Sequence, residues 1–199
     1  TDTVICEGES AALDATSPLA GMVPITFEQI PQIPFGAANY PNNNPYESVI
    51  NVNSINPLVL TDPTAQIESV CVNIETNWNG DINLFLESPT GQTLELSTGN
   101  GGGSDNYTNT CFTPTAATPI NAGTGPFTGD FQPEGNWTDL TGSNINGNWI
   151  LRASDAFAPN DVGEFTSWSI TFNNNNEVTY SWEGDDLSCT DCPDPVATP

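Results

Sequence analysis

The sequence has almost no positive charge. Its 199 residues include 25 acidic side chains but a single basic one, Arg152, so the formal net charge is −24, and lysine and histidine are absent. Proteins bind nucleic acids by neutralising phosphates with lysine and arginine, so we expect no nucleic-acid binding. An anionic membrane surface would repel the chain for the same reason. A phosphate-binding loop is not expected either, since such a loop adds a lysine to its backbone N–H groups.

The missing residue types also exclude most catalytic sites. Without histidine there is no Ser-His-Asp triad, no Cys-His dyad and no His-ligated zinc, and without lysine there is no Schiff-base chemistry. A pair of carboxylates, as in glycoside hydrolysis, remains open, whereas the Asp-Thr-Gly signature of aspartic proteases is absent. We therefore predict that the chain is not an enzyme.

Long apolar runs are absent too. No stretch of about 18 apolar residues occurs, so no membrane insertion is expected. The chain opens on "TDTVICEGES", which is not a signal peptide, and this predicts a processed or excised piece of a longer protein. Abundant Asn, Gly, Pro and Thr together with the lack of lysine predict an extracellular or cell-surface location.

Five cysteines are present, and in a secreted chain we expect them to pair. Cys189 and Cys192 form a Cys-x-x-Cys, but the prolines that follow at once exclude the helix of a redox motif, so we predict a tight structural disulfide. We expect Cys71 to pair with Cys111. Cys6 is then left over, and an odd cysteine in a secreted chain invites a partner outside it.

Alternating apolar and polar residues predict an all-β protein. Period-two patterns place one side of each strand on a core, and they occur around residues 70–74, 82–86, 94–96, 149–153 and 168–172. Turn sequences such as "NWNGD", "SPTG" and "NINGN" separate them. Short antiparallel strands with such turns predict a β-sandwich or jelly roll.

Two composition types suggest two domains. Residues 24–173 form a strand-rich body, whereas residues 1–23 and 174–199 are predicted to build a second, outer domain. The Asn run 173–176 is the expected boundary because it has no apolar face to bury.

Several motifs in the body occur in an order that resembles a known family. They are "GDINLFLESPTG", the Gly-rich "GGGSDNYTNTCF", a Pro-Glu-Gly segment, "NGNW" and the closing "GEFTSWSITF". Together they resemble the P domain that follows the catalytic domain of kexin-like and furin-like proprotein convertases. The resemblance implies a sandwich of jelly-roll type, which in secreted bacterial proteins often occurs without a protease.

The two flanks resemble something else. "DTVICEGESAAL" and "TYSWEGDDLSCTDCPDPVATP" are similar to the ends of an Ig-like, PKD-type repeat found in surface proteins of Bacteroidetes. This implies a P-like domain inserted into a partial Ig-like sandwich that lacks its last strands. Missing strands are expected to come from neighbouring domains of the parent protein or from like subunits in a fibre.

Bacterial P-like domains resemble calcium binders, and this chain has suitable oxygen ligands on loops. The candidates are Asp105 in the Gly-rich loop and, further along, Asp155, Asn160, Asp161 and Glu164. The competing interpretation is that glycine and aspartate simply form turns here.

The tryptophans divide into core and surface candidates. Trp137, Trp149 and Trp168 match core positions of the resembled family, whereas Trp78 lies on the turn "NWNGD" and is a candidate contact for a sugar or a protein. Arg152 is expected to point away from the core and to pair with a carboxylate.

Three functions remain open at this point. The first is a calcium-stabilised structural and adhesive module of a large secreted surface or fibre protein. The second is a carbohydrate-binding module, with Trp78 and either Tyr40 or Tyr46 stacking on surface glycans. The third is an accessory maturation domain of a secreted subtilisin-like protease.

Overall fold

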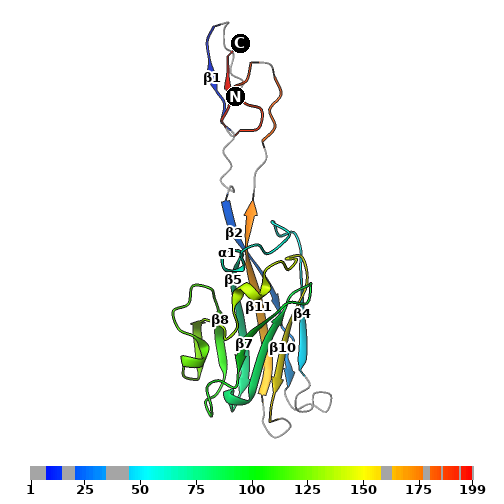
Figure 1. The fold of residues 1–199 in the computed structure, drawn as a ribbon, viewed down its shortest axis with the longest axis vertical. Helices are drawn as coiled ribbons and strands as arrows, with labels where there is room; N and C mark the ends of the chain where they lie inside the picture. The colour runs from blue at the N-terminus through cyan, green and yellow to red at the C-terminus, as the bar shows by residue number, and fades with distance from the viewer. Residues whose placement is uncertain are drawn as a thin grey trace. The chain divides into compact units, whose positions relative to one another are not determined.

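The computed structural model describes residues 8–14, 21–34, 45–157, 163–176, 180–184, 186–192 and 194–198. The chain divides into two compact units (Figure 1). The larger unit is Pro24–Asn174, and the smaller combines Thr1–Val23 with Asn175–Pro199. Cys6, Tyr40, Asn160 and Asp161 lie outside the described residues.

Two β-sheets build the larger unit, which confirms the predicted all-β sandwich. The first sheet has the order β4 (Tyr46–Val52), β10 (Gly147–Asp155), β6 (Ile82–Glu87) and β7 (Thr93–Thr98). The second has the order β2 (Gly21–Gln29), β11 (Gly163–Asn176), β5 (Ile67–Thr76), β8 (Tyr107–Phe112) and β9 (Phe127–Phe131), with β3 (Ile33–Pro34) also paired to β11.

Helical segments are short and lie between the strands. The one α-helical turn among the residues described above is α1 (Pro63–Gln66). It begins after Asp62, whose carboxylate accepts a hydrogen bond from Thr64 N at 3.1 Å. Three 3-10 turns complete the described helices: η1 (Asn79–Asp81), η2 (Ile120–Ala122) and η3 (Trp137–Leu140). No helix of the described residues is long and apolar enough to cross a membrane.

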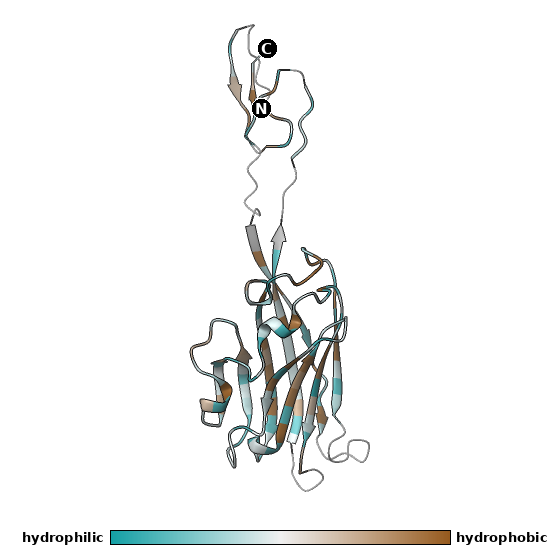
Figure 2. Cartoon of the chain, viewed as in Figure 1, coloured by the Kyte–Doolittle hydropathy of each residue, from teal (hydrophilic) through white to brown (hydrophobic). Residues whose placement is uncertain are grey.

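The core lies between the two sheets, and apolar residues are concentrated along their strands (Figure 2). The rings of Trp149 on β10 and Phe172 on β11 have centroids 5.4 Å apart, so they join the sheets directly. Trp168 on β11 donates its indole N–H to Ser48 Oγ on β4 at 2.8 Å. Both tryptophans are buried, as predicted, because the alternation of each strand turns them inward.

The strand pairing contains one departure from the predicted antiparallel pattern. Strands β8 and β9 are parallel, with Tyr107 opposite Phe127 and Cys111 opposite Asp130. Parallel neighbours need a long crossover, and residues 113–126, which include η2, provide it. None of the turn sequences singled out above lies in this crossover, so the direction of β9 was not predicted.

The asparagine run proved to be more than a boundary. Residues 173–176 continue β11, and Asn174 is buried. Asn174 Oδ1 accepts a hydrogen bond from Asn56 N at 2.7 Å, and Asn173 Nδ2 donates to Ala65 O at 3.0 Å. The run has no apolar face to bury, but the side-chain amides of Asn173 and Asn174 bind backbone groups of neighbouring loops.

The described part of the smaller unit contains one short sheet. Its strands β1 (Ala11–Ala12) and β12 (Val196–Ala197) are antiparallel and join segments from both ends of the sequence. A disulfide links Cys189 to Cys192. Trp182 donates its indole N–H to Cys192 O at 2.8 Å, so the aromatic ring is fixed beside the disulfide loop.

Candidate functional site

The Gly-rich loop packs backbone against backbone with the segment that carries Trp78. Asn79 N donates to Ser104 O at 2.7 Å, and Gly80 N donates to Gly102 O at 2.9 Å. Gly101 has φ +86°, and a Cβ there would lie 2.7 Å from the ring of Phe127. The glycines are therefore required by close packing and by a left-handed backbone conformation.

The indole of Trp78 lies over this loop. A Cβ at Gly103 would be 3.1 Å from the ring, which is closer than ordinary van der Waals contact, so the glycine lets the ring lie close to the loop. Thr76 Oγ1 accepts a hydrogen bond from Trp78 N at 3.2 Å and helps to fix the turn. The Trp78 side chain remains 50% exposed, as predicted, and offers a large apolar surface to solvent.

An open groove beside this turn contains three carboxylates. Its volume is about 420 Å³, and it is lined by Glu75, Thr76, Asn77, Asp105, Asn106, Gly163 and Glu164. Glu75 on β5 lies directly opposite Glu164 on β11 in the strand register. We call Glu75, Asp105 and Glu164 the acidic groove.

The predicted calcium ligands are only partly brought together. Asp105 and Glu164 line the same groove, whereas Asp155 does not line it. Asp155 is buried at the end of β10, where its Oδ1 accepts a hydrogen bond from Phe157 N at 2.8 Å. Within the described ranges, no three acidic, histidine or cysteine side chains are grouped closely enough to hold a metal ion. Calcium binding therefore stays a prediction.

Arg152 lies on the outward side of the first sheet, as expected. Its Nε is 2.8 Å from Glu47 Oε1 and its Nη1 is 2.5 Å from Glu87 Oε2. The hydrogen bond with Glu47 is the main reason that the pKa of the guanidinium is raised further above its usual value. Both partners lie on strands adjacent to β10. The one basic side chain is thus paired with carboxylates of the first sheet, whereas Glu75 and Glu164 of the acidic groove belong to the second sheet.

The disulfide between Cys71 and Cys111 is present as predicted. The two residues are directly opposite in the pairing of β5 and β8, with Cα atoms 4.0 Å apart. Neighbouring Val70 and Val72 point into the core. The bond therefore ties the two strands together on the face away from the core.

A second groove, of about 460 Å³, was not predicted. It is lined by three prolines, Pro114, Pro119 and Pro133, together with Trp137 and neighbouring polar residues. The indole N–H of Trp137 is buried and has no hydrogen-bond partner. Pro114 and Pro119 lie in the crossover between β8 and β9, and Pro133 follows β9. The groove therefore depends on the path of this crossover, which the sequence pattern did not reveal.

Other residues that sequence reasoning missed are Glu75 and Phe157. Glu75 was not singled out in the sequence, and its position opposite Glu164 depends on the register of β5 and β11. Phe157, which is 56% exposed, follows the end of β10. Tyr46, a candidate for sugar stacking, instead packs edge-on against Phe165 with ring centroids 6.1 Å apart.

The profile of the proprotein convertase P-domain matches residues 67–172, more than half of the sequence. The chain belongs to this family. The match begins at the first residue of β5 and ends within β11, so the P domain profile contains Trp78, the Gly-rich loop and all three carboxylates of the acidic groove. The resemblance seen in the sequence is thereby confirmed.

Two solved structures are also similar to this P-domain chain. One is a serine protease of Aeromonas sobria, 14% identical, with a TM-score of 0.47 over 80% of this chain and 28% of that one. The other is the complex of Aeromonas sobria serine protease with its chaperone, at 14% identity and a TM-score of 0.41, covering 85% and 27%. The chain thus spans less than a third of the length of these structures. No curated protein matches the sequence.

Proposed function

We propose that residues 24–174 act as a non-catalytic accessory P domain that accompanies the catalytic domain of a secreted subtilisin-like protease. The observation that carries this proposal is the match of the P-domain profile to residues 67–172. The composition supports it, because a sequence without histidine or lysine lacks the usual nucleophile-activating bases.

An extracellular setting fits the same proposal. The disulfide between Cys71 and Cys111 is of the kind that persists in oxidising compartments. Residues 24–174 contain 15 acidic side chains and one basic one, so their formal net charge is −14, which disfavours self-association. The domain would then act through its surface, by contact with a catalytic domain, rather than by chemistry of its own.

The proposal is tested by finding which polypeptide carries the domain in its native setting. Antibodies raised against residues 24–174 would capture the natural protein, and peptide sequencing by mass spectrometry would define the rest of it. A subtilisin-like catalytic domain on the captured chain, or bound to it, is the expected result. Capture of a chain that consists only of repeated β domains, with no protease, would overturn the proposal.

A second candidate is a structural and adhesive module of a surface or fibre protein. The observation that favours it is the pairing of β1 with β12, which joins segments on either side of the P domain into one small sheet. A domain placed between two paired segments is typical of insertion into another β domain. The Ig-like identity of that outer unit belongs to this candidate, and the capture experiment separates the two.

A further inference from the structure

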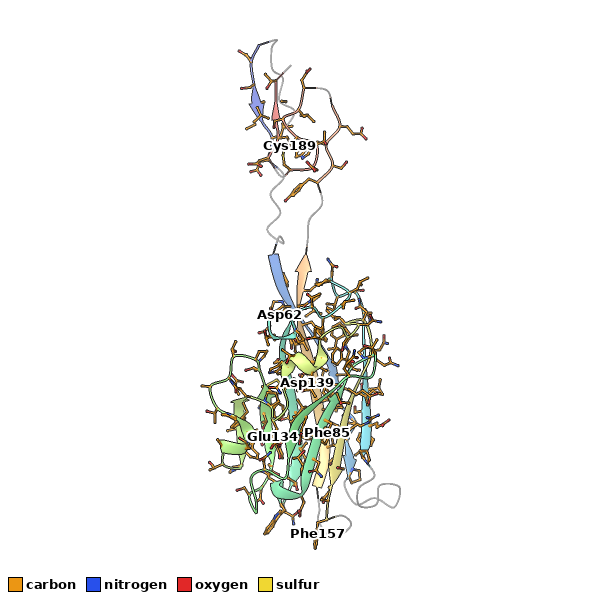
Figure 3. The ribbon with its side chains drawn as sticks, in the orientation of Figure 1. Asp62, Phe85, Glu134, Asp139, Phe157 and Cys189 are labelled. Atoms are coloured by element: carbon orange, nitrogen blue, oxygen red, sulfur yellow. A yellow bond between two sulfur atoms is a disulfide. The ribbon has the colours of Figure 1, made fainter. Side chains whose placement is uncertain are left out.

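Two large apolar side chains are exposed on adjoining loops at one end of the sandwich. Trp78 is 50% exposed and Phe157 is 56% exposed, and Phe157 is labelled at that end in Figure 3. Asp81 connects their loops, because its N–H donates to Trp78 O at 3.2 Å while its carbonyl accepts from Ala156 N at 2.7 Å. We call Trp78 and Phe157 the aromatic tip.

The turn that carries Trp78 is built to hold the ring in place. Gly103 contacts the indole, and a Cβ at Gly80 would lie 3.3 Å from its Nε1. The backbone on both sides is hydrogen-bonded to the Gly-rich loop. A large side chain that is already fixed loses little conformational entropy when a partner binds, which favours its use as a contact surface.

The acidic groove is connected to this ring through both segments, and Trp78 itself does not line the groove. Glu75 precedes Trp78 by three residues, and Asp105 follows Gly103 by two. Within the described residues, none of the groove's three carboxylates has a hydrogen bond or an ion pair. The chain has no spare cation for them, because Arg152 is held by Glu47 and Glu87.

Two of the three neutral polar side chains of the groove, those of Thr76 and Asn106, are engaged in the fold. Asn106 Oδ1 accepts a hydrogen bond from Thr76 N at 2.9 Å, and Thr76 Oγ1 accepts from Trp78 N. The three carboxylates and the side-chain amide of Asn77 are therefore the groups left for a ligand. Three carboxylates against one amide favour a cation over a neutral sugar.

We propose that the aromatic tip and the acidic groove together dock an arginine-bearing segment of a partner protein. A guanidinium stacks on an indole face and donates paired hydrogen bonds to carboxylates, so it matches both halves of the surface. Charge complementarity with a chain of net charge −24 supports a basic partner. The groove volume, about 420 Å³, lies within the range of ligand sites.

The test is a nuclear magnetic resonance titration of the whole ¹⁵N-labelled chain with the peptide Gly-Arg-Gly-Arg-Gly, in the presence of a calcium chelator. The matched control peptide carries citrulline at both arginine positions, which keeps the shape and removes the charge. We expect saturable shifts of the Trp78 indole N–H and of the Gly103 and Asp105 amides with the arginine peptide only. Diffuse shifts over the surface, or equal shifts with citrulline, would overturn the proposal.

Variants distinguish binding at this site from a general attraction of the peptide to the negatively charged chain. Glu75→Gln with Glu164→Gln should weaken binding about fivefold, and Trp78→Ala about threefold. The matched control combines Glu68→Gln, at the other end of β5, with Asp130→Asn on β9, and should leave the affinity unchanged. The glutamine variants remove only charge, so the test stands even if Trp78→Ala does not fold. Equal losses in both double variants would contradict a specific site.

The same titration decides between a protein and a sugar. Neutral oligosaccharides of glucose and of N-acetylglucosamine serve as probes. The account predicts no shift of the Trp78 indole N–H with either. A saturable shift at Trp78 with an oligosaccharide, and none with the arginine peptide, would replace the proposed partner with a glycan.

Discussion

Glu75 on β5 and Glu164 on β11 face each other across an antiparallel strand pair, with no positive charge beside them among the described residues. Like charges directly opposite on neighbouring strands are destabilising. The pair is therefore expected to lower the stability of the sandwich. A binding role for the groove would explain that cost.

Removing one charge of this pair should stabilise the fold. We expect Glu75→Gln to raise the free energy of unfolding by about 0.2–1 kcal/mol, because it relieves the repulsion from Glu164. Urea denaturation at low ionic strength measures the change, and Glu68→Gln on the same strand is the control. The difference between the two variants should shrink in high salt, which screens exposed charges. A Glu75→Gln variant no more stable than Glu68→Gln would show that the pair carries no strain.

The disulfide between β5 and β8 should be a major contributor to stability. Its cysteines are 40 residues apart in the sequence, and closing a loop of that length stabilises by about 4 kcal/mol in the loop-entropy model. We expect Cys71→Ser with Cys111→Ser to lower the free energy of unfolding by an amount of this order in urea denaturation. The disulfide between Cys189 and Cys192 closes a far shorter loop. Cys189→Ser with Cys192→Ser should therefore lower the free energy of unfolding less. A larger loss of stability in the Cys189/Cys192 variant than in the Cys71/Cys111 variant would contradict the major role given to the disulfide between β5 and β8.

Alkaline pH should destabilise the protein through Tyr107. Burial raises the pKa of its phenol to about 12, from 10.0. Between these two values the unfolded chain loses the proton while the folded chain keeps it, so stability falls as the pH rises, by about 1.4 kcal/mol per pH unit. Tyr107→Phe should flatten this slope between pH 10 and 12, measured by urea denaturation at each pH. An unchanged slope would show that other groups cause the alkaline loss.

Calcium should raise the melting temperature if the predicted ligands form a site. A ligand that binds only the folded state at a hundredfold excess over its Kd adds about 2.7 kcal/mol. Asp105→Asn and Asp161→Ala should remove most of the rise in a thermal melt with millimolar calcium. Asp155→Ala is less informative, because it also removes the hydrogen bond to Phe157 N. If sodium chloride of the same ionic strength raised the melting temperature as much as calcium does, the effect would be charge screening and not a specific site.

Local patterns were sufficient to predict the sandwich and much of its core. The alternation around Val70, Trp149 and Trp168 fixed which side chains are buried, because side chains of a strand point to opposite faces in turn. The parallel pairing of β8 with β9 was missed, since turn residues do not encode the direction in which a long loop returns.

The candidate site was predicted only in pieces. Exposed Trp78 and the carboxylates of Asp105 and Glu164 were found from residue type and loop position. Their arrangement was not, because Glu75 meets Glu164 through the register of two strands almost ninety residues apart in the sequence. Asp155 was predicted as a metal ligand from its residue type, and the sequence gives no sign of the hydrogen bond that its carboxylate accepts from Phe157 N.

The most direct test of the proposed accessory role is deletion of residues 24–174 from the natural gene. The measurement is the half-life of secreted proteolytic activity at elevated temperature, normalised to active sites titrated with a serine-directed irreversible inhibitor. The account predicts that the deletion shortens the half-life or prevents secretion of active protease, while full-length protein with Glu68→Gln behaves as the natural one. Secreted activity of unchanged amount and half-life after the deletion would contradict the account.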